Sequence, residues 1–291
     1  MIAGLLIKPI PMKKILVPID FSKVSAYGTT LAVKIANYMK SEIRFVHVIN
    51  LPSHILLTPE GELFEDGDFD TSVQKLQKEK ALLNLDDWKS KYFPTATTSV
   101  VYGHVNDTLL SLVKKEHFDL VVMGTHAVSG LSEFLSHTHG EYLAMHSPVP
   151  VMTLKCDRSD MQIKKIVLAS SFKNPDVPHA ESLVKLVNAF NAKLYLLRIN
   201  TPADFISDSQ IYKNMDAFIE KHGIKNVEKA IYNDHHVEDG IVHFVAQEDI
   251  DIIGIGSWQR TGLNKLINGC VSSDLLNHVF KPIFTFKLKD A

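Results

Sequence analysis

Short apolar runs alternate with amphipathic stretches along most of the chain. In the first half, runs rich in Ile, Val and Leu predict strands over residues 15–19, 43–49, 98–102, 120–124 and 149–154. Between these runs, apolar residues recur at helical spacing, as Leu31, Ile35 and Met39 do. This spacing predicts helices over residues 24–39, 72–92, 105–115 and 138–146. Strands that alternate with such helices are typical of βαβ units around a parallel sheet.

The second half of the chain repeats the first. The segment KKILVPIDFS at residues 13–22 returns 151 positions later as KKIVLASSFK, and DLVVMGTHAVSGL at residues 119–131 returns 132 positions later as DIIGIGSWQRTGL. The same criteria predict strands over residues 166–170, 194–199, 227–232, 252–256 and 283–287. They predict helices over residues 178–190, 203–222, 238–247 and 271–279. The fold class is therefore expected to be α/β, with two doubly wound parallel five-stranded sheets.

A polar segment, CDRSDMQ at residues 156–162, separates the two copies and is expected to link them. We expect the first domain at residues 1–156, with its core from residue 12 to residue 156, and the second domain at residues 163–291. Met12 stands directly before the first predicted strand and is an alternative start of the chain.

The composition is that of an ordinary globular protein, with 45% hydrophobic and 22% charged residues among 291. A formal net charge of −2 gives no electrostatic reason to expect a nucleic acid or an anionic membrane as a partner. Cys156 and Cys270 are the only cysteines, so no disulfide framework is expected and a reducing cytoplasm fits best. Lys8, Pro9 and Pro11 interrupt the apolar N-terminal stretch well before the ~20 residues of a membrane span, so neither a span nor a secretory signal is expected.

Motifs of common hydrolases are absent from the sequence. It has no Walker A loop, G-x-S-x-G elbow or HExxH, so we expect a binding protein and not an enzyme. His126, His137, His139 and His146 lie close together in the sequence and raise the alternative of a zinc site. No cysteine or carboxylate stands near them with a recognised ligand spacing, so no metal is predicted.

The order strand, VPIDFS, helix, strand, helix, strand, helix, MGTHAVSGL, helix, SPVPVM resembles that of the universal stress protein family, here as two copies in one chain. The resemblance covers almost the whole chain and implies a flavodoxin-like fold with the strand order 3-2-1-4-5 in each domain. In that family, two subunits commonly pair through the last strand of the sheet. We therefore expect an internal pseudo-dimer, in which Val149 to Leu154 pairs antiparallel with Ile283 to Phe286, since each would otherwise be an exposed apolar edge.

ATP-binding members of that family carry the loop G-x2-G-x9-G-[ST] after the fourth strand. Glycine lets backbone N–H groups approach the phosphates, and the following helix offers its free N–H groups. The first copy has Gly124, Ala127, His137 and Thr138 at these positions, so it keeps the hydroxyl but lacks two of three glycines. We expect the imidazole of His137 to block the phosphate position. A protonated His137 that attracts phosphate is the alternative.

An acid at the tip of the first strand is the other element by which the family holds a nucleotide, at its adenine-ribose end. Asp20 stands there in the first copy, whereas the second copy has the neutral Ser171. A helix N-cap or turn role is the structural alternative for Asp20. The loop positions of the second copy are occupied by Gly256, Gln259, Gly269 and Cys270. Any nucleotide is therefore expected in the first domain.

Placed on this sequence, the resemblance implies a ligand site formed by Pro18, Ile19, Asp20, Val48, Gly103, Met123, Gly124, His126, Ala127, His137 and Thr138. We expect a cytoplasmic stress-response regulatory protein that binds an adenine nucleotide, ATP, in its first domain without turnover. The alternative is a universal stress protein that has lost nucleotide binding and acts as a protein-interaction module. Association of two whole chains into a homodimer is a further alternative that the sequence leaves open.

Overall fold

The computed structural model describes residues 12–52, 55, 57–59, 61–64, 71–125, 138–173, 177, 180–257 and 279–287. The first half contains the strands β1 (Lys14–Pro18), β2 (Glu42–Ile49), β3 (Thr97–Tyr102), β4 (Leu120–Gly124) and β5 (Val151–Leu154). Its helices are α1 (Lys23–Met39), α2 (Ser72–Tyr92), α3 (Val105–Lys115) and α4 (His139–His146). The second half contains the strands β6 (Lys165–Ala169), β7 (Lys193–Asn200), β8 (Val227–Asn233), β9 (Ile252–Ser257) and β10 (Ile283–Lys287). Its described helices are α5 (Glu181–Phe190), α6 (Asp208–His222) and α7 (Val237–Gln247).

Most of these boundaries lie within two residues of those expected from the sequence. The helix expected from residue 203 instead begins at Asp208, because Thr201 and Asp204 form an antiparallel bridge that turns the chain first. The helix expected from residue 178 begins at Glu181. The helix expected over residues 271–279 lies largely outside the described residues.

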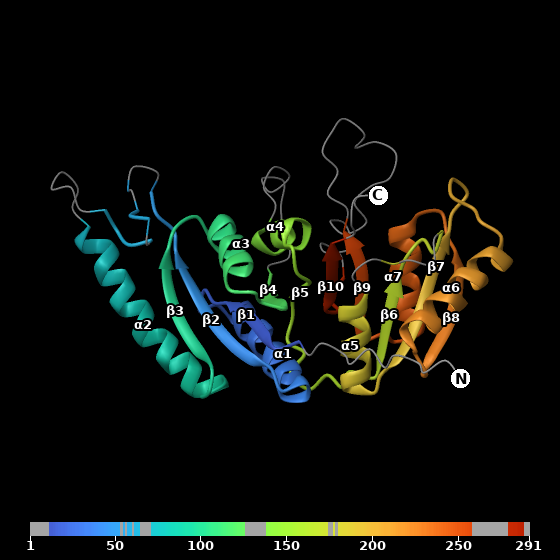
Figure 1. The fold of residues 1–291 in the computed structure, drawn as a ribbon, viewed down its shortest axis with the longest axis horizontal. Coiled ribbons are helices and arrows are strands. Elements are labelled where there is room, and N and C mark those ends of the chain that lie inside the picture. Colours follow the sequence, from blue (N-terminus) through green and yellow to red (C-terminus); the bar gives the residue numbers. More distant parts are fainter. Residues whose placement is uncertain are drawn as a thin grey trace, which may run out of the picture.

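The described strands join one ten-stranded sheet in the order β3-β2-β1-β4-β5-β10-β9-β6-β7-β8. Within each half all neighbouring strands are parallel and follow the order 3-2-1-4-5, so the predicted doubly wound, flavodoxin-like α/β fold is confirmed. In the middle of the sheet β5 and β10 lie side by side and run antiparallel, with Phe284 opposite Met152 (Figure 1). The hydroxyl of Thr285 also donates a hydrogen bond of 3.0 Å to the carbonyl oxygen of Val151. Each end strand thereby covers the apolar edge of the other.

The internal repeat extends to unusual backbone conformations. Phe21 and Phe172, 151 positions apart, have φ values of 63° and 43°. His117 and Asp249, 132 positions apart, have φ values of 54° and 48°. Positive φ is uncommon for residues other than glycine, so its recurrence at matched positions indicates that the two halves follow the same path in detail.

Helices cover both faces of the sheet. On one face, α1, α2, α5 and α6 share a single apolar core that crosses both halves and includes Ile35, Leu85, Leu183 and Phe218. On the other face, α3 and α4 cover the first half through Leu109 and Leu143, and α7 covers the second half through Phe244. None of the helices in the described residues is both long and apolar enough to cross a membrane.

Candidate functional site

The candidate site lies where β1 and β4 end. These strands are neighbours in the sheet, but α1 after β1 and α4 after β4 pack on opposite faces. Such a topological switch point, at the carboxyl ends of the strands, is where open α/β sheets bind ligands. The predicted residues Pro18, Ile19 and Asp20 follow one another here, and Met123 and Gly124 end β4.

Ile19 belongs to the sheet and not to an open surface. Its side chain is buried, and its backbone N–H donates to the carbonyl oxygen of Val46 at 2.8 Å. Nδ1 of His47 lies 2.7 Å from the carbonyl oxygen of Ile19, so this nitrogen carries a proton and donates. The imidazole also packs on the ring of Phe21, with centroids 4.8 Å apart. His47 therefore links β2 to the segment between β1 and α1.

Asp20 takes part in the start of α1. Its Oδ1 accepts hydrogen bonds from the backbone N–H of Ser22 at 2.9 Å and from the hydroxyl of Ser25 at 2.5 Å. The hydroxyl of Ser22 in turn caps α1 by accepting from the backbone N–H of Ser25 at 3.1 Å. The turn role that was the alternative for Asp20 is thus present, and a ligand would have to share this carboxylate with the helix start.

Close packing requires glycine at position 124, whether or not a ligand binds. A Cβ atom on Gly124 would lie 1.9 Å from the carbonyl oxygen of Val24, because α1 crosses β4 at close approach. Any residue larger than glycine would force the helix away from the strand. The first glycine of the predicted loop is therefore required by the fold itself.

Gly103 and Val48 lie at the ends of the two strands beyond β1, since Val48 lies near the end of β2 and Gly103 directly follows β3. Gly103 follows β3 with a φ of 140°, and a Cβ atom there would lie 2.4 Å from the hydroxyl oxygen of Thr108. Its backbone N–H donates to the carbonyl oxygen of Ile49 at 3.1 Å. Val48 in β2 is half-buried against the core beneath α3 and α4. Both residues shape the edge, and glycine at 103 lets the chain turn from β3 into α3.

Thr138 is the N-cap of α4. Its hydroxyl accepts from the backbone N–H of Glu141 at 3.2 Å, and the carboxylate of Glu141 accepts from the backbone N–H of Thr138 at 3.2 Å. Thr125, which follows β4, donates its hydroxyl to that of Thr138 at 3.2 Å. This capping box ties the start of α4 to the end of β4. His126, Ala127 and His137, the remaining predicted site residues, lie outside the described residues.

Two ionisable side chains, those of Glu141 and Lys155, lie near the start of α4. Glu141 is buried, and its charge acts on Lys155, the residue after β5. Burial lowers the pKa of Lys155, and the carboxylate of Glu141 partly offsets that effect. The Nζ atom of Lys155 is buried without a hydrogen-bond partner, so a cation that lacks full compensation stands near the N-terminus of α4.

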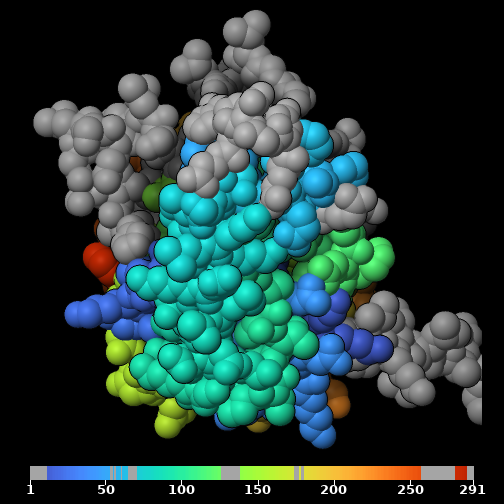
Figure 2. Space-filling model, turned by 90° about the vertical axis from the view of Figure 1, so that its left-hand side faces the viewer, coloured from blue at the N-terminus to red at the C-terminus, as the bar shows by residue number. Residues whose placement is uncertain are grey.

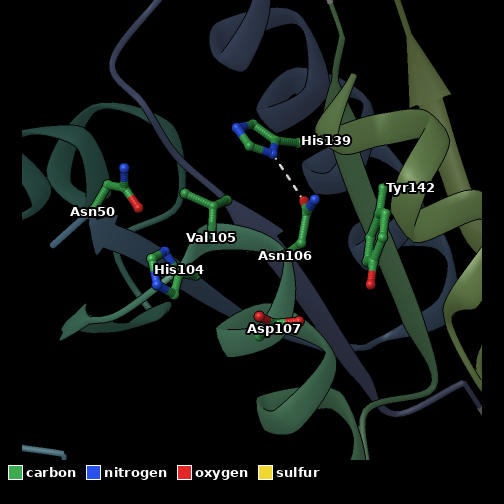
Figure 3. Close-up of a pocket in the computed structure, with 7 residues that line it drawn as sticks. All are labelled: Asn50, His104, Val105, Asn106, Asp107, His139 and Tyr142. Carbon is green, nitrogen blue, oxygen red and sulfur yellow. Dashed lines mark hydrogen bonds between the residues drawn. The ribbon is translucent and has the colours of Figure 1, made fainter. Parts of the chain in front are cut away.

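A cavity of about 480 Å³ opens beside these residues, between the starts of α3 and α4 (Figure 3). It is lined by Asn50, His104, Val105, Asn106, Asp107, His139 and Tyr142. Figure 3 shows Asn106 of α3 pointing to His139 at the start of α4, and Nδ1 of His139 lies 2.8 Å from Oδ1 of Asn106. Apart from His139 in the histidine cluster, none of these residues was expected from the sequence to belong to a site. Their one sequence signal is that Asn50 directly follows the apolar run of β2 and that His104 follows that of β3 after one intervening residue, Gly103.

The histidines form no metal site in the described part of the chain. No group of three or more His, Cys, Asp or Glu side chains there is arranged to hold a metal ion. His139 contacts Asn106, and His146 lies with Nδ1 2.8 Å from the carbonyl oxygen of Tyr142 in its own helix. His126 and His137 fall outside the described residues.

The second half has a different set of residues at the matching edge. Ser171 is exposed after β6 and replaces Asp20, while Arg198 in β7 stands where β2 has His47. Gln259, Gly269 and Cys270 lie outside the described residues. At their described carboxyl edges, the two halves therefore have the same strand arrangement but different side chains.

Fold and site together define an α/β protein of flavodoxin-like topology with a polar site at the switch point of its first half. Residues 11–155 match the model of the universal stress protein family. A universal stress protein from Methanocaldococcus jannaschii is 27% identical over 145 residues, which are 49% of this chain and 82% of that protein. Universal stress protein YxiE of Bacillus subtilis is 25% identical over 145 residues, which are 49% of this chain and 98% of that protein. The chain belongs to the universal stress protein family.

The whole chain has a counterpart of similar fold. A crystal structure of a universal stress protein from Archaeoglobus fulgidus is 18% identical, with a TM-score of 0.74, and the match covers 96% of this chain and 97% of that chain. A putative universal stress protein from Pseudomonas aeruginosa gives a TM-score of 0.62 at 16% identity, with 95% of this chain and 94% of that chain covered. At these identities the likeness concerns the fold, including the arrangement of the two halves.

Proposed function

We propose that this chain is a regulatory protein of the stress response that binds an adenine nucleotide, ATP, in a first domain at residues 1–156. The second domain, residues 163–291, then serves as a degenerate partner without a nucleotide. The observation that carries this proposal is that Asp20 after β1, the N-terminus of α4 at Thr138 and a cavity of about 480 Å³ between the starts of α3 and α4 all lie at the carboxyl edge of the sheet in the first half.

Each part of the edge suits one part of a nucleotide. The free N–H groups and positive dipole end of α4, with the buried ammonium group of Lys155 nearby, favour phosphate oxygens. Asn50, His104 and Asn106 offer amide and imidazole groups that hydrogen-bond to a base or a sugar. The aromatic side chain of Tyr142 adds an apolar wall.

Binding without turnover is proposed because two carboxylates at this edge, those of Asp20 and Glu141, already serve the fold. Oδ1 of Asp20 is engaged by Ser22 and Ser25, and Glu141 caps α4. Carboxylates held in this way are poorly placed to share a Mg²⁺ ion or to activate water. The proposed role of the bound nucleotide is therefore to change the shape or stability of the protein.

The experiment that tests the proposal is mass spectrometry of small molecules released when freshly purified protein is denatured. We expect an adenine nucleotide at close to one molecule per chain, because only the first domain is proposed to bind it. Protein without released nucleotide, which also shows no thermal stabilisation by added ATP, would contradict the proposal.

A second candidate function, a ligand-free interaction module, is favoured by the surface of α2. Val73, Leu76 and Leu83 of this helix are 57%, 66% and 71% exposed. Figure 2 looks onto α2, drawn in cyan, which covers the outer strand β3 at that end of the sheet. Exposed apolar side chains on one helix are a common feature of surfaces that bind another protein, including a second copy of the chain. Under this candidate, substitution of Leu76 and Leu83 by Lys would abolish partner binding and leave any response to ATP unchanged.

A further inference from the structure

Two cations stand at the carboxyl edge of the second half. Arg198 belongs to β7 and occupies the position of His47 in β2, 151 residues earlier. Lys173 follows β6 and occupies the position of Ser22, the N-cap of α1. The second half therefore has a positive pair at an edge where the first half has an imidazole and a hydroxyl.

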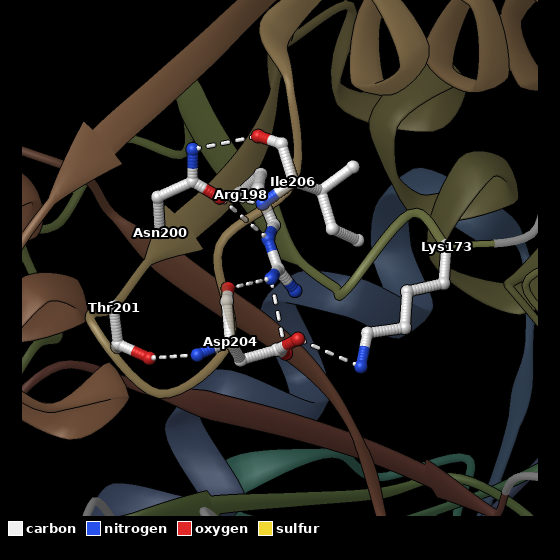
Figure 4. Close-up of polar contacts among 6 residues, drawn as sticks. All are labelled: Lys173, Arg198, Asn200, Thr201, Asp204 and Ile206. Atoms are coloured by element: carbon white, nitrogen blue, oxygen red, sulfur yellow. Dashed lines mark hydrogen bonds and ion pairs between the residues drawn. The ribbon is translucent and has the colours of Figure 1, made fainter.

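Asp204 is seated on this pair (Figure 4). Its carboxylate lies 3.0 Å from Nη2 of Arg198 and 2.8 Å from Nζ of Lys173. Nη2 of Arg198 also donates to the carbonyl oxygen of Asp204 at 2.6 Å. Nε of Arg198 donates to Oδ1 of Asn200 at 3.3 Å. The two cations thus converge on one carboxylate.

The carboxylate is delivered by a loop and not by the sheet. Asp204 stands in the segment between the end of β7 at Asn200 and the start of α6 at Asp208. The side-chain amide of Asn200 holds this segment by donating to the carbonyl oxygen of Ile206 at 3.1 Å and accepting from its N–H at 3.4 Å. The backbone N–H of Asp204 donates to the hydroxyl of Thr201 at 3.2 Å. A few hydrogen bonds in a short loop therefore keep the carboxylate in place.

Arg198 is the member of the group that requires an anion. Its side chain is 4% exposed, against 56% for Lys173 and 35% for Asp204. A charge buried to this degree is costly unless a counter-ion pairs with it. Burial of Asp204 disfavours its charged form, but the hydrogen bonds and charges of Lys173 and Arg198 outweigh this, so the pKa of Asp204 lies below its ordinary value.

We propose that Arg198 and Lys173 form an oxyanion site in the second half, that Asp204 is its resident carboxylate, and that a phosphate group binds there when the loop carrying Asp204 moves away. The planar guanidinium group of Arg198 matches the oxygens of phosphate as well as those of carboxylate. The loop therefore acts as an internal ligand that keeps the site closed. This site is separate from the nucleotide site proposed for the first half.

Removal of the resident charge tests the proposal. In Asp204→Asn the site keeps both cations, and we expect inorganic phosphate, at about 100 times its Kd, to raise the Tm by roughly 5 °C relative to chloride at equal ionic strength. The matched control is Asp216→Asn, which removes a carboxylate of α6 that pairs with Lys229 at the surface, and it should gain no response to phosphate.

Adding Arg198→Met to Asp204→Asn should lower phosphate affinity by at least about tenfold. Adenosine monophosphate in place of phosphate shows whether the ligand is the free ion or a phosphate ester, according to which binds more tightly.

The wild-type protein supplies a measurement that does not depend on the folding of a variant. Backbone amide exchange at Asp204 and Ile206 should become faster in phosphate than in chloride of equal ionic strength, because phosphate competes with the carboxylate and frees the loop. Exchange that is equal in both salts, or a folded Asp204→Asn protein that gains no more from phosphate than Asp216→Asn does, would overturn the proposal.

Discussion

Matched positions of the two halves have the same backbone conformation after the first strand, but their side chains differ in charge at the carboxyl edge of the sheet. Phe21 and Phe172 share a positive φ at the first turn after the first strand of each half. The residue before each of them differs in charge, since Asp20 corresponds to Ser171. The backbone path is therefore common to both halves, whereas the acid belongs to the first half alone.

Asp20 should matter for nucleotide binding in a way that Ser171 does not. Asp20→Ala removes the one charged acceptor at the tip of β1, so we expect the rise in Tm on addition of ATP to be lost. Ser171→Ala, its matched control at the same position of the second half, should leave the rise unchanged. The measurement is the ATP-dependent difference in Tm, which separates binding from any effect of Asp20 on the start of α1. Equal losses in the two variants would rule out the proposed asymmetry.

His137 is expected to limit affinity for ATP. The pair of substitutions His137→Gly and Ala127→Gly restores the glycines of the family loop and clears a path for backbone N–H groups to the phosphates. We expect ATP affinity, measured by titration calorimetry, to rise by about tenfold or more, which corresponds to one charge-assisted hydrogen bond. His117→Gly is the control that removes an imidazole away from the site, at a residue whose φ of 54° suits glycine. An unchanged or weaker affinity in a folded double variant would show that steric blockage is the wrong explanation.

At the scale of the element, one carboxylate in each half ties the first strand to the fourth. Oδ2 of Asp119 accepts from the backbone N–H groups of Lys13 and Lys14 at 2.7 and 3.0 Å. Oδ2 of Asp251 accepts from those of Lys164 and Lys165 at 2.8 and 2.9 Å. The two clamps fix the register at which β1 and β6 enter the sheet.

Loss of either clamp should lower the free energy of unfolding. Asp119→Ala leaves two backbone donors without their charged acceptor, so we expect a loss of about 1 to 3 kcal/mol in urea unfolding. Asp216→Ala removes an exposed ion pair with Lys229 and should cost less than about 0.5 kcal/mol. Should Asp119→Ala be no less stable than Asp216→Ala, the clamp would have no role in stability.

The loop before α6 should respond to acid through Asp204. A carboxyl group whose pKa is lowered on folding stabilises the folded state above its ordinary pKa, and the contribution is lost as the pH falls through the folded value. The stability difference between the wild type and Asp204→Asn should therefore narrow as the pH falls below 3.8, the ordinary value for the group. Chemical unfolding at a series of pH values measures this difference. A constant difference over the whole range would mean that the pairing with Lys173 and Arg198 is not electrostatic.

For the whole molecule, the junction of the two halves combines strand pairing with a shared core. β5 and β10 pair antiparallel in the middle of the sheet. The core under α1, α2, α5 and α6 is continuous across this junction, and the rings of Tyr38 in α1 and Phe190 in α5 stack across it with centroids 4.3 Å apart. The halves are therefore expected to unfold together in a single transition.

Proline at the centre of the junction should separate the two halves. Met152→Pro removes the backbone donor of β5 that faces β4 and thereby distorts the strand that pairs with β10, so we expect calorimetry to show two transitions or early loss of one half. Met152→Leu keeps the volume and the N–H group and should cost less than about 1.5 kcal/mol with one transition. A Met152→Pro protein that unfolds in one transition at the wild-type Tm would refute a structural role for this pairing.

Much of the fold could be predicted because the relevant signals are local. The spacing of apolar residues predicted α3 at 105–115 and α2 at 72–92 with the bounds that the structure gives them. The candidate site was predictable only in part. The position of Asp20 follows from the end of β1, but its bonds to Ser22 and Ser25 do not. The cavity between α3 and α4 had almost no sequence signal, because its lining comes from three separated segments.

The repeat, the order of elements and the two apolar end strands could all be inferred from the amino-acid sequence alone. Each of these depends on the pattern of side chains along a single strand or helix, or on the comparison of two segments. In contrast, the close approach of Val24 to Gly124 and the pairing of Asp204 with Arg198 and Lys173 became apparent from the three-dimensional fold. Such partners are set by distances in space between elements that cross, and apolar periodicity along the chain carries no record of those distances.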